Sequence, residues 1–180
     1  MLEFELKVRI SSLDPVRSQL AGHNAQFLGR VHEHDVYYNA PHRDFGVTDE
    51  AVRVRYSSGH AVVTYKGAKI ASSGLKAREE LNTAVESGEV FEEILDRLGF
   101  TRTAEVNKWR EMYQLGTAAI SLDSVEGLGT FVEIEVLAER NDSVAAAQVK
   151  RISKEIGIQG EPILASYLEL LLSKRSGVQS

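Results

Sequence analysis

The sequence predicts an α+β protein in which eight antiparallel strands close into a barrel with a charged interior, covered outside by about four helices. Three observations predict this fold. Eight stretches alternate between apolar and polar residues, as strands do when their two faces meet different surroundings. Acids and bases, rather than Ser, Thr or Gln, fill most of the polar positions. Four amphipathic helices need apolar surface, and the apolar strand faces are their natural partners.

The first predicted strand shows the alternation most clearly. In residues 2–10, Leu6 and Val8 fall on one face, whereas Glu5 and Lys7 fall on the other. The other predicted strands, in chain order, are 32–39, 50–58, 60–67, 74–85, 103–115, 117–124 and 130–138. Eight strands can close into a barrel, which removes the exposed sheet edges.

Helix signals separate or follow the strands. Asp14 can cap a helix with Pro15 at its first position, running toward Gly22. Further helices are predicted at 88–98, at 143–156 and from Pro162 to the last leucines of the chain. Residues 67–74 are expected to form a polar hairpin loop.

The charged strand faces decide what the barrel encloses. A single strand of this kind would ordinarily turn its polar face to water. Because the helices need the apolar faces, the charged faces turn toward one another. Desolvating an ion costs several kcal/mol unless water or counter-charge compensates it. A wet tunnel that binds a polyanion meets these needs, so the tunnel is the candidate functional site.

Bulk composition narrows the function. The 180 residues suit one domain, expected to span 1–180. There are no cysteines, which excludes disulfides and thiolate metal sites. No apolar run reaches transmembrane length and no signal peptide is visible, so we expect a cytoplasmic protein that does not bind membranes. The net charge of −5 argues against nucleic-acid binding.

Paired carboxylates predict a metal site in the tunnel. Glu3 and Glu5 are two positions apart on one strand, so both point inward, about 7 Å apart along the chain. Glu133 and Glu135 repeat this arrangement. Carboxylate oxygens without thiolates suit Mg²⁺ or Mn²⁺. The tunnel bases can then hold phosphate oxygens, Arg through bidentate contacts and Lys as a point charge.

The order of these residues resembles the CYTH family, also called triphosphate tunnel metalloenzymes. Its signature is Glu-x-Glu-x-Lys near the N-terminus, here residues 3–7. Further matches are Asp35 with Tyr37, Arg53 with Arg55, Lys66, Lys76 and Arg78 with Glu80, Lys108 with Arg110, Asp123, and Glu133 with Glu135. Segments 44–55, 122–135 and 166–171 are most similar to the branch named for class IV adenylyl cyclases. Relatives often carry Gln before the acid-and-tyrosine segment, where this chain has His32-Glu33-His34-Asp35.

The resemblance implies roles for individual residues, and it implies that two Mg²⁺ or Mn²⁺ ions bind. The implied metal ligands are Glu3, Glu5, Asp123, Glu133 and Glu135. The implied triphosphate ligands are Lys7, Arg53, Arg55, Lys66, Lys76, Arg78, Lys108 and Arg110. The implied catalytic residues are Glu5, Lys7, Asp35 and Asp123. A homodimer is common among similar proteins.

Three functions remain open on the sequence. An adenylyl cyclase, which we favour, would convert ATP to cyclic AMP and pyrophosphate. A triphosphatase would hydrolyse inorganic tripolyphosphate, thiamine triphosphate or a nucleoside triphosphate. A non-catalytic polyphosphate-binding module is a third hypothesis, although a pure anion binder gains little from inward carboxylates.

Overall fold

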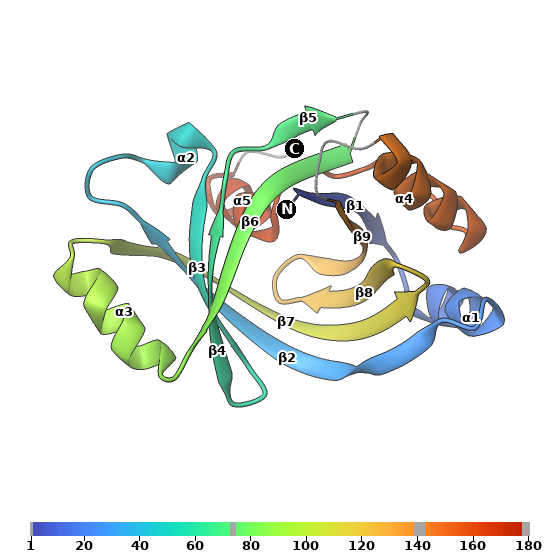
Figure 1. The fold of residues 1–180 in the computed structure, drawn as a ribbon, viewed down its shortest axis with the longest axis horizontal. Helices are drawn as coiled ribbons and strands as arrows, with labels where there is room; N and C mark the ends of the chain where they lie inside the picture. Colours follow the sequence, from blue (N-terminus) through green and yellow to red (C-terminus); the bar gives the residue numbers. More distant parts are fainter. Residues whose placement is uncertain (1, 73–74, 139–142, 178–180) are drawn as a thin grey trace.

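The computed structural model describes residues 2–72, 75–138 and 143–177, without the side chains of residues 71, 72 and 76, and it confirms the closed barrel (Figure 1). The eight barrel strands are β1 (Leu2–Ile10), β2 (Gln26–Asn39), β3 (Ala51–Ser57), β4 (His60–Lys66), β6 (Leu75–Val85), β7 (Thr101–Leu115), β8 (Ala118–Val125) and β9 (Gly129–Ala138). The helices are α1 (Asp14–Gly22), α2 (Phe45–Thr48), α3 (Gly88–Arg97), α4 (Ser143–Glu155) and α5 (Tyr167–Arg175).

Pairing between the first and sixth strands closes the barrel. The sheet runs in the order β1-β9-β8-β7-β2-β3-β4-β6, and every neighbouring pair is antiparallel. β6 then pairs with β1, where Glu3 lies opposite Arg78. A short strand, β5 (Ile70–Ser72), also pairs with β6.

Strands of the barrel are buried on both faces, for two different reasons. In β1, all residues from Phe4 to Val8 are buried, although Glu5 and Lys7 are charged. The apolar face of β1, with Phe4 and Val8, belongs to a core cluster that includes Val149 of α4. The charged face turns to the tunnel and meets other charged groups there. The predicted direction of the two faces is therefore confirmed for this strand.

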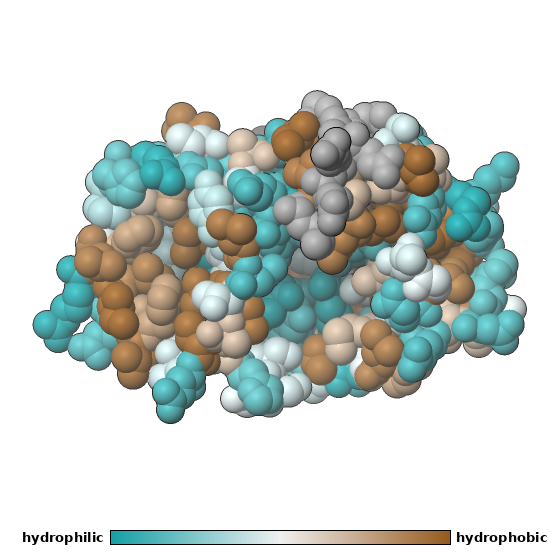
Figure 2. Space-filling model, viewed as in Figure 1, coloured by the Kyte–Doolittle hydropathy of each residue, from teal (hydrophilic) through white to brown (hydrophobic). Residues whose placement is uncertain are grey.

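Helices cover the barrel at separate places (Figure 1). α1 and α4 pack on the largest apolar cluster, which includes Leu20, Ile120, Ile134 and Ile152. α3 covers a second cluster through Leu95, beside Val36 of β2. Part of α3 stays uncovered, because Val90, Ile94 and the C-cap residue Leu98 are exposed, and hydrophobic residues gather over this helix in Figure 2.

Two predictions about strands are wrong. The predicted loop 67–74 contains the strand β5, because Ile70 pairs with Ala77 of β6. β2 begins at Gln26 instead of residue 32, because its first residues pair with the end of β7, as Gln26 does with Gln114. In both cases pairing with a neighbouring strand decides the structure, and a single stretch of sequence carries little sign of that pairing.

The last helix begins later than predicted. Pro162 does not open it, since Ile163 instead donates its backbone N–H to the carbonyl oxygen of Lys7 at 2.8 Å. α5 starts at Tyr167, where Ser166 and Glu169 form a reciprocal capping box. α2, a single helical turn, adds a fifth helix that the apolar periodicity did not predict.

Hydrophilic residues line the hollow near the middle of the face shown in Figure 2. No helix in the described part of the chain has both the length and the apolar composition needed to span a membrane.

Candidate functional site

Three carboxylates gather in the tunnel where β1 and β9 pair. Glu3, Glu5 and Glu135 each offer an oxygen within 4.8 Å of those of the other two. Glu5 and Glu135 lie directly opposite each other in the ladder. Burial and the charge of Glu135 raise the pKa of Glu3 well above its ordinary value. Burial and the charge of Glu133 likewise raise the pKa of Glu135. A group of acids that repel one another in this way is a suitable site for a hard cation.

Lys66 and Glu80 form the wall next to this group. The ammonium of Lys66 lies 2.7 Å from a carboxylate oxygen of Glu80 and 4.0 Å from one of Glu3. Burial alone would lower the pKa of Lys66, but the neighbouring carboxylates outweigh it and raise the pKa. Lys66 therefore stays charged next to the three acids, where an anionic ligand could reach both.

A second cluster surrounds Asp35. Arg55 donates from Nε to Oδ1 of Asp35 at 2.6 Å, while Arg53 and Lys108 approach Oδ2 at 3.3 and 3.4 Å. Burial would raise the pKa of Asp35, but the charges of Arg53 and Lys108 hold it well below its ordinary value. Asp35 thus remains a carboxylate that positions cations, and it is a poor proton acceptor.

A third cluster joins β7, β8 and β9. Arg110 donates to both carboxylate oxygens of Asp123, at 2.8 and 2.6 Å, and also to Glu133. Lys7 lies 3.0 Å from Glu5 and 3.3 Å from Glu133. The cations Arg110 and Lys7 overcome the effect of burial and lower the pKa of Glu133 to about 2. Asp123 and Glu133, both expected as metal ligands, are therefore held by cations and lie outside the three-carboxylate group.

The sequence did not predict the roles of two residues that contact the charged side chains of the tunnel. Glu33 is buried and bridges Lys108 at 2.7 Å and Arg55 at 3.0 Å. Its inward direction could have been inferred, because it is two positions before Asp35 on the same strand. Tyr167 of α5 donates its hydroxyl to Asp123 at 2.9 Å, and the Lys7 ammonium lies 4.5 Å from its ring centre. α5 therefore packs on the apolar core and also contributes Tyr167 to the tunnel lining.

Arg78 and Lys76 complete the set expected to bind phosphate. The Arg78 guanidinium is buried and donates to the backbone oxygen of Gly67 at 2.7 Å and to Asp49 at 3.1 Å. These bonds fix its position while it still lines the tunnel. Lys76 lies opposite Glu5 in the β1–β6 ladder, but its side chain is outside the described part of the structure.

The tunnel encloses a cavity of about 130 Å³. Its charged lining consists of Glu3, Glu5, Asp35, Glu80, Glu133, Glu135, Lys7, Arg53, Arg55, Lys66, Arg78, Lys108 and Arg110. All of the expected site residues with described side chains line it, except Asp123, which lies behind Arg110. Acids and bases are nearly equal in number in this lining, so the tunnel alone has little excess positive charge. A bound divalent cation would add positive charge and strengthen the attraction for an anion.

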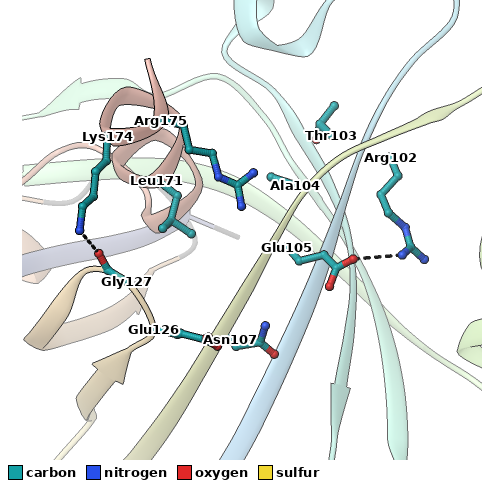
Figure 3. A pocket seen from close by; sticks show the side chains of 10 residues that line it. All are labelled: Arg102, Thr103, Ala104, Glu105, Asn107, Glu126, Gly127, Leu171, Lys174 and Arg175. Atoms are coloured by element: carbon teal, nitrogen blue, oxygen red, sulfur yellow. Dashed lines mark hydrogen bonds and ion pairs between the residues drawn. The ribbon is translucent and has the colours of Figure 1, made fainter. Parts of the chain in front are cut away.

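A larger cavity of about 660 Å³ lies between β7 and α5 (Figure 3). Its charged side chains are partly engaged with their surroundings: Lys174 donates to the carbonyl oxygen of Gly127 at 2.6 Å, and Arg102 donates to Glu105 at 3.0 Å. None of the three clustered carboxylates lines this cavity. Size therefore does not identify the functional site, and the tunnel with its concentrated charges is the stronger candidate.

Known proteins resemble this chain in sequence or in fold. A Methanocaldococcus jannaschii protein, provisionally named an adenylate cyclase, is 37% identical over 173 residues, covering 94% of this chain and 98% of its own length. A solved structure from Pyrococcus horikoshii is 38% identical with a TM-score of 0.86, covering 96% of this chain and 99% of that one. A Hippeastrum protein provisionally named an adenylyl cyclase, and described as having a dominant triphosphatase activity, shares the fold at 20% identity and a TM-score of 0.70, covering 99% of this chain and 97% of that one.

The fold and the site define a class of closed-barrel proteins that hold acids and bases inside a tunnel. The CYTH domain matches residues 1–167, which includes every barrel strand and ends at Tyr167. This chain belongs to the CYTH domain family.

Proposed function

We propose that this protein is a metal-dependent enzyme acting on triphosphate-bearing substrates, and that its reaction is the conversion of ATP to cyclic AMP and pyrophosphate. The observation that carries the proposal is the tunnel itself, where three clustered carboxylates face a set of buried lysines and arginines. Such a pairing of hard-cation ligands and phosphate ligands suits a polyphosphate better than any uncharged substrate.

The tunnel bases would bind and orient the phosphates. Arg53, Arg55 and Lys108 all contact Asp35, which holds them on one wall of the tunnel. Their N–H groups would donate to phosphate oxygens when the substrate binds. Lys66 and Lys7 lie close to the three-carboxylate group. Cations fixed before the ligand arrives stabilise developing negative charge without reorganising during the reaction. Arg110 lines the tunnel as well and would contact phosphate while Asp123 behind it fixes its position.

Glu3, Glu5 and Glu135 would hold the divalent cation. The fit rests on the donor set: three carboxylate oxygens close together, with raised pKa values at Glu3 and Glu135 that a bound cation would relieve. When bound, Mg²⁺ or Mn²⁺ supplies charge neutralisation at phosphate and lowers the pKa of an attached hydroxyl or water. We expect Glu5 and Lys7 to act as catalytic residues because they lie at the junction of the carboxylate group and the cation set.

In the cyclase reaction the ribose 3′-oxygen would bond to the α-phosphorus, the bond to pyrophosphate would break, and the hydroxyl proton would pass to water or to pyrophosphate, so Asp35 is not required as a base. Its depressed pKa makes it a weak proton acceptor, so we assign it a positioning role for the arginines. Asp123 is likewise engaged by Arg110 and Tyr167 on both oxygens. Catalysis would come mainly from holding the ribose 3′-oxygen in line with the α-phosphorus and from charge neutralisation.

Hydrolysis is the second candidate reaction. It is favoured by the Hippeastrum neighbour with its triphosphatase activity, and by a tunnel whose charges would bind the triphosphate and not the rest of the ligand. Purified protein with Mg²⁺ or Mn²⁺ should be offered ATP and tripolyphosphate separately. Cyclic AMP with pyrophosphate supports the cyclase, and orthophosphate release supports the triphosphatase. Tight binding of both without turnover would leave a polyphosphate-binding module.

A further inference from the structure

A second cavity adjoins the tunnel and has a different chemical character. This side cavity has a volume of about 160 Å³ and lies between α2, α5 and the ends of β2 and β3. It shares four lining residues with the tunnel, so the two spaces meet there: Tyr37, Ala51, Arg78 and Ser166. The tunnel lining is charged, whereas much of the side cavity is lined by the aromatic and aliphatic side chains of Phe45, Leu168 and Leu172 together with Tyr37.

The charges of the side cavity are largely compensated. Glu50 pairs with Arg43 at 2.8 Å, and Glu169 and Asp49 pair with Lys69 at 2.6 and 2.8 Å. Asp44 also lines the cavity, and its side chain accepts hydrogen bonds from the backbone N–H of Gly46 at 2.9 Å and from the Asn39 amide at 3.2 Å. An uncharged ring is therefore a better occupant than a phosphate or a cationic ring.

The dimensions suit a planar ring. An apolar cavity of about 150 Å³ is enough to hold a benzene ring in another protein. Here the cavity reaches the surface beside Leu172, which is 40% exposed, so a larger heterocycle could extend outward. Tyr37 and Phe45 offer aromatic surfaces on which a heteroaromatic ring can stack.

We propose that the side cavity binds the uncharged planar heteroaromatic ring of a nucleoside triphosphate while the tunnel holds its phosphates. This inference rests on the proposed function, since it assigns a place to the organic part of that substrate. Arg78 marks the boundary, because its guanidinium is fixed by Gly67 and Asp49 and lines both spaces. Tyr37 would then be a specificity-determining residue at the junction.

Leu172→Trp tests the assignment, because Leu172 lines the side cavity and not the tunnel, and a larger side chain at this partly exposed position takes up space in the side cavity. The matched control is Leu98→Trp at the C-cap of α3, an exposed leucine that lines neither space. Dissociation constants and initial rates for ATP and for tripolyphosphate are measured with each variant and with the parent protein. We expect Leu172→Trp to weaken ATP binding at least tenfold and to leave tripolyphosphate binding unchanged, with Leu98→Trp unchanged for both.

Other results separate the two proposals. An equal loss for both ligands, or no loss for either, overturns the side-cavity assignment and leaves the tunnel chemistry standing. A preference of the parent protein for thiamine triphosphate over ATP overturns the assignment of an uncharged ring. If the parent protein binds and converts neither ATP nor tripolyphosphate, the proposed function itself fails. Circular dichroism of each variant confirms that the barrel is folded.

Discussion

Glu5 is the single side chain on which most of the proposed chemistry converges. It belongs to the three-carboxylate group and also lies 3.0 Å from Lys7. Glu5→Gln keeps the shape of the side chain and removes its charge. Removing an outer-sphere partner of a bound metal typically costs about 10- to 100-fold in affinity or activity, so a direct ligand should cost at least as much. We expect kcat to fall by that factor while some triphosphate binding survives, as measured by initial rates and calorimetry.

Glu79→Gln is the matched control for Glu5→Gln. Glu79 is an exposed carboxylate on β6, between two residues that line the tunnel. Its loss should leave kcat unchanged. A Glu5→Gln variant as active as the Glu79→Gln variant would remove Glu5 from the metal site.

Asp35 should matter more for stability than for proton transfer. It is buried against three cations, and breaking a buried pair by removing one partner typically costs about 3–5 kcal/mol. Because the pKa of Asp35 is lower in the folded state, its stabilisation is present above the unfolded value of about 3.9 and is lost as the pH falls below it. Asp35→Asn should therefore lower the free energy of unfolding at neutral pH and flatten its decline under acid.

Urea titrations at pH 7 and at several points below pH 5 measure both effects of Asp35→Asn. The curves of the variant and the parent protein should converge as the pH falls. Curves that stay parallel down to pH 3 would show that the Asp35 carboxylate is not held by its neighbours.

Helices and strands differ in how far the sequence predicts them. β1, β4 and α1 could be placed almost residue by residue, because alternation and helix-start signals are local. The predicted cap of α1 is wrong, since Leu13 is the N-cap residue and Asp14 is the first residue of the helix. β5 could not be placed, since its residues form a strand through pairing with β6. The start of α5 could not either, because Ile163 and Ala165 are held by Lys7 through contacts distant in sequence. The same holds for the site. The spacing of the carboxylates predicts that they point into the barrel. It does not predict that Glu135 joins the three-carboxylate group while Glu133 pairs with Arg110, because the register of the barrel strands decides those partners.

The capping box of α5 gives a test at the level of one helix. Ser166 accepts a hydrogen bond from the backbone N–H of Glu169 at 3.2 Å, and the Glu169 side chain accepts one from the backbone N–H of Ser166 at 2.7 Å. Losing an N-cap hydroxyl costs about 0.5–2 kcal/mol. Ser166→Ala should destabilise the protein by that amount in urea titration, whereas Ser173→Ala in the body of the same helix should be nearly neutral. Equal effects at the two positions would argue against the cap.

The acids enclosed by the barrel lower the free energy of unfolding, and a bound cation would restore it. Raised pKa values at Glu3 and Glu135 mean that their ionised forms disfavour the folded state at neutral pH. A cation that binds the folded protein alone stabilises it by about 2.7 kcal/mol at a hundredfold excess over its dissociation constant. For a chain of this size, that corresponds to a rise in Tm of about 5–10 °C. Mn²⁺ should produce this rise in a thermal melt, and a chelator should abolish it.

Glu135→Gln separates this metal effect from general ionic stabilisation of the barrel. Without a metal, the variant should melt at or above the temperature of the parent protein, because the substitution removes an ionised group that burial and Glu133 disfavour. With Mn²⁺ it should gain little, because one of the three clustered oxygens is no longer a carboxylate. Ca²⁺-free buffers at constant ionic strength keep screening equal between the melts. A Glu135→Gln variant whose Tm rises with Mn²⁺ as much as that of the parent would show that the cation binds elsewhere. A lower Tm than the parent in chelator would show that the ionised Glu135 does not destabilise the folded protein.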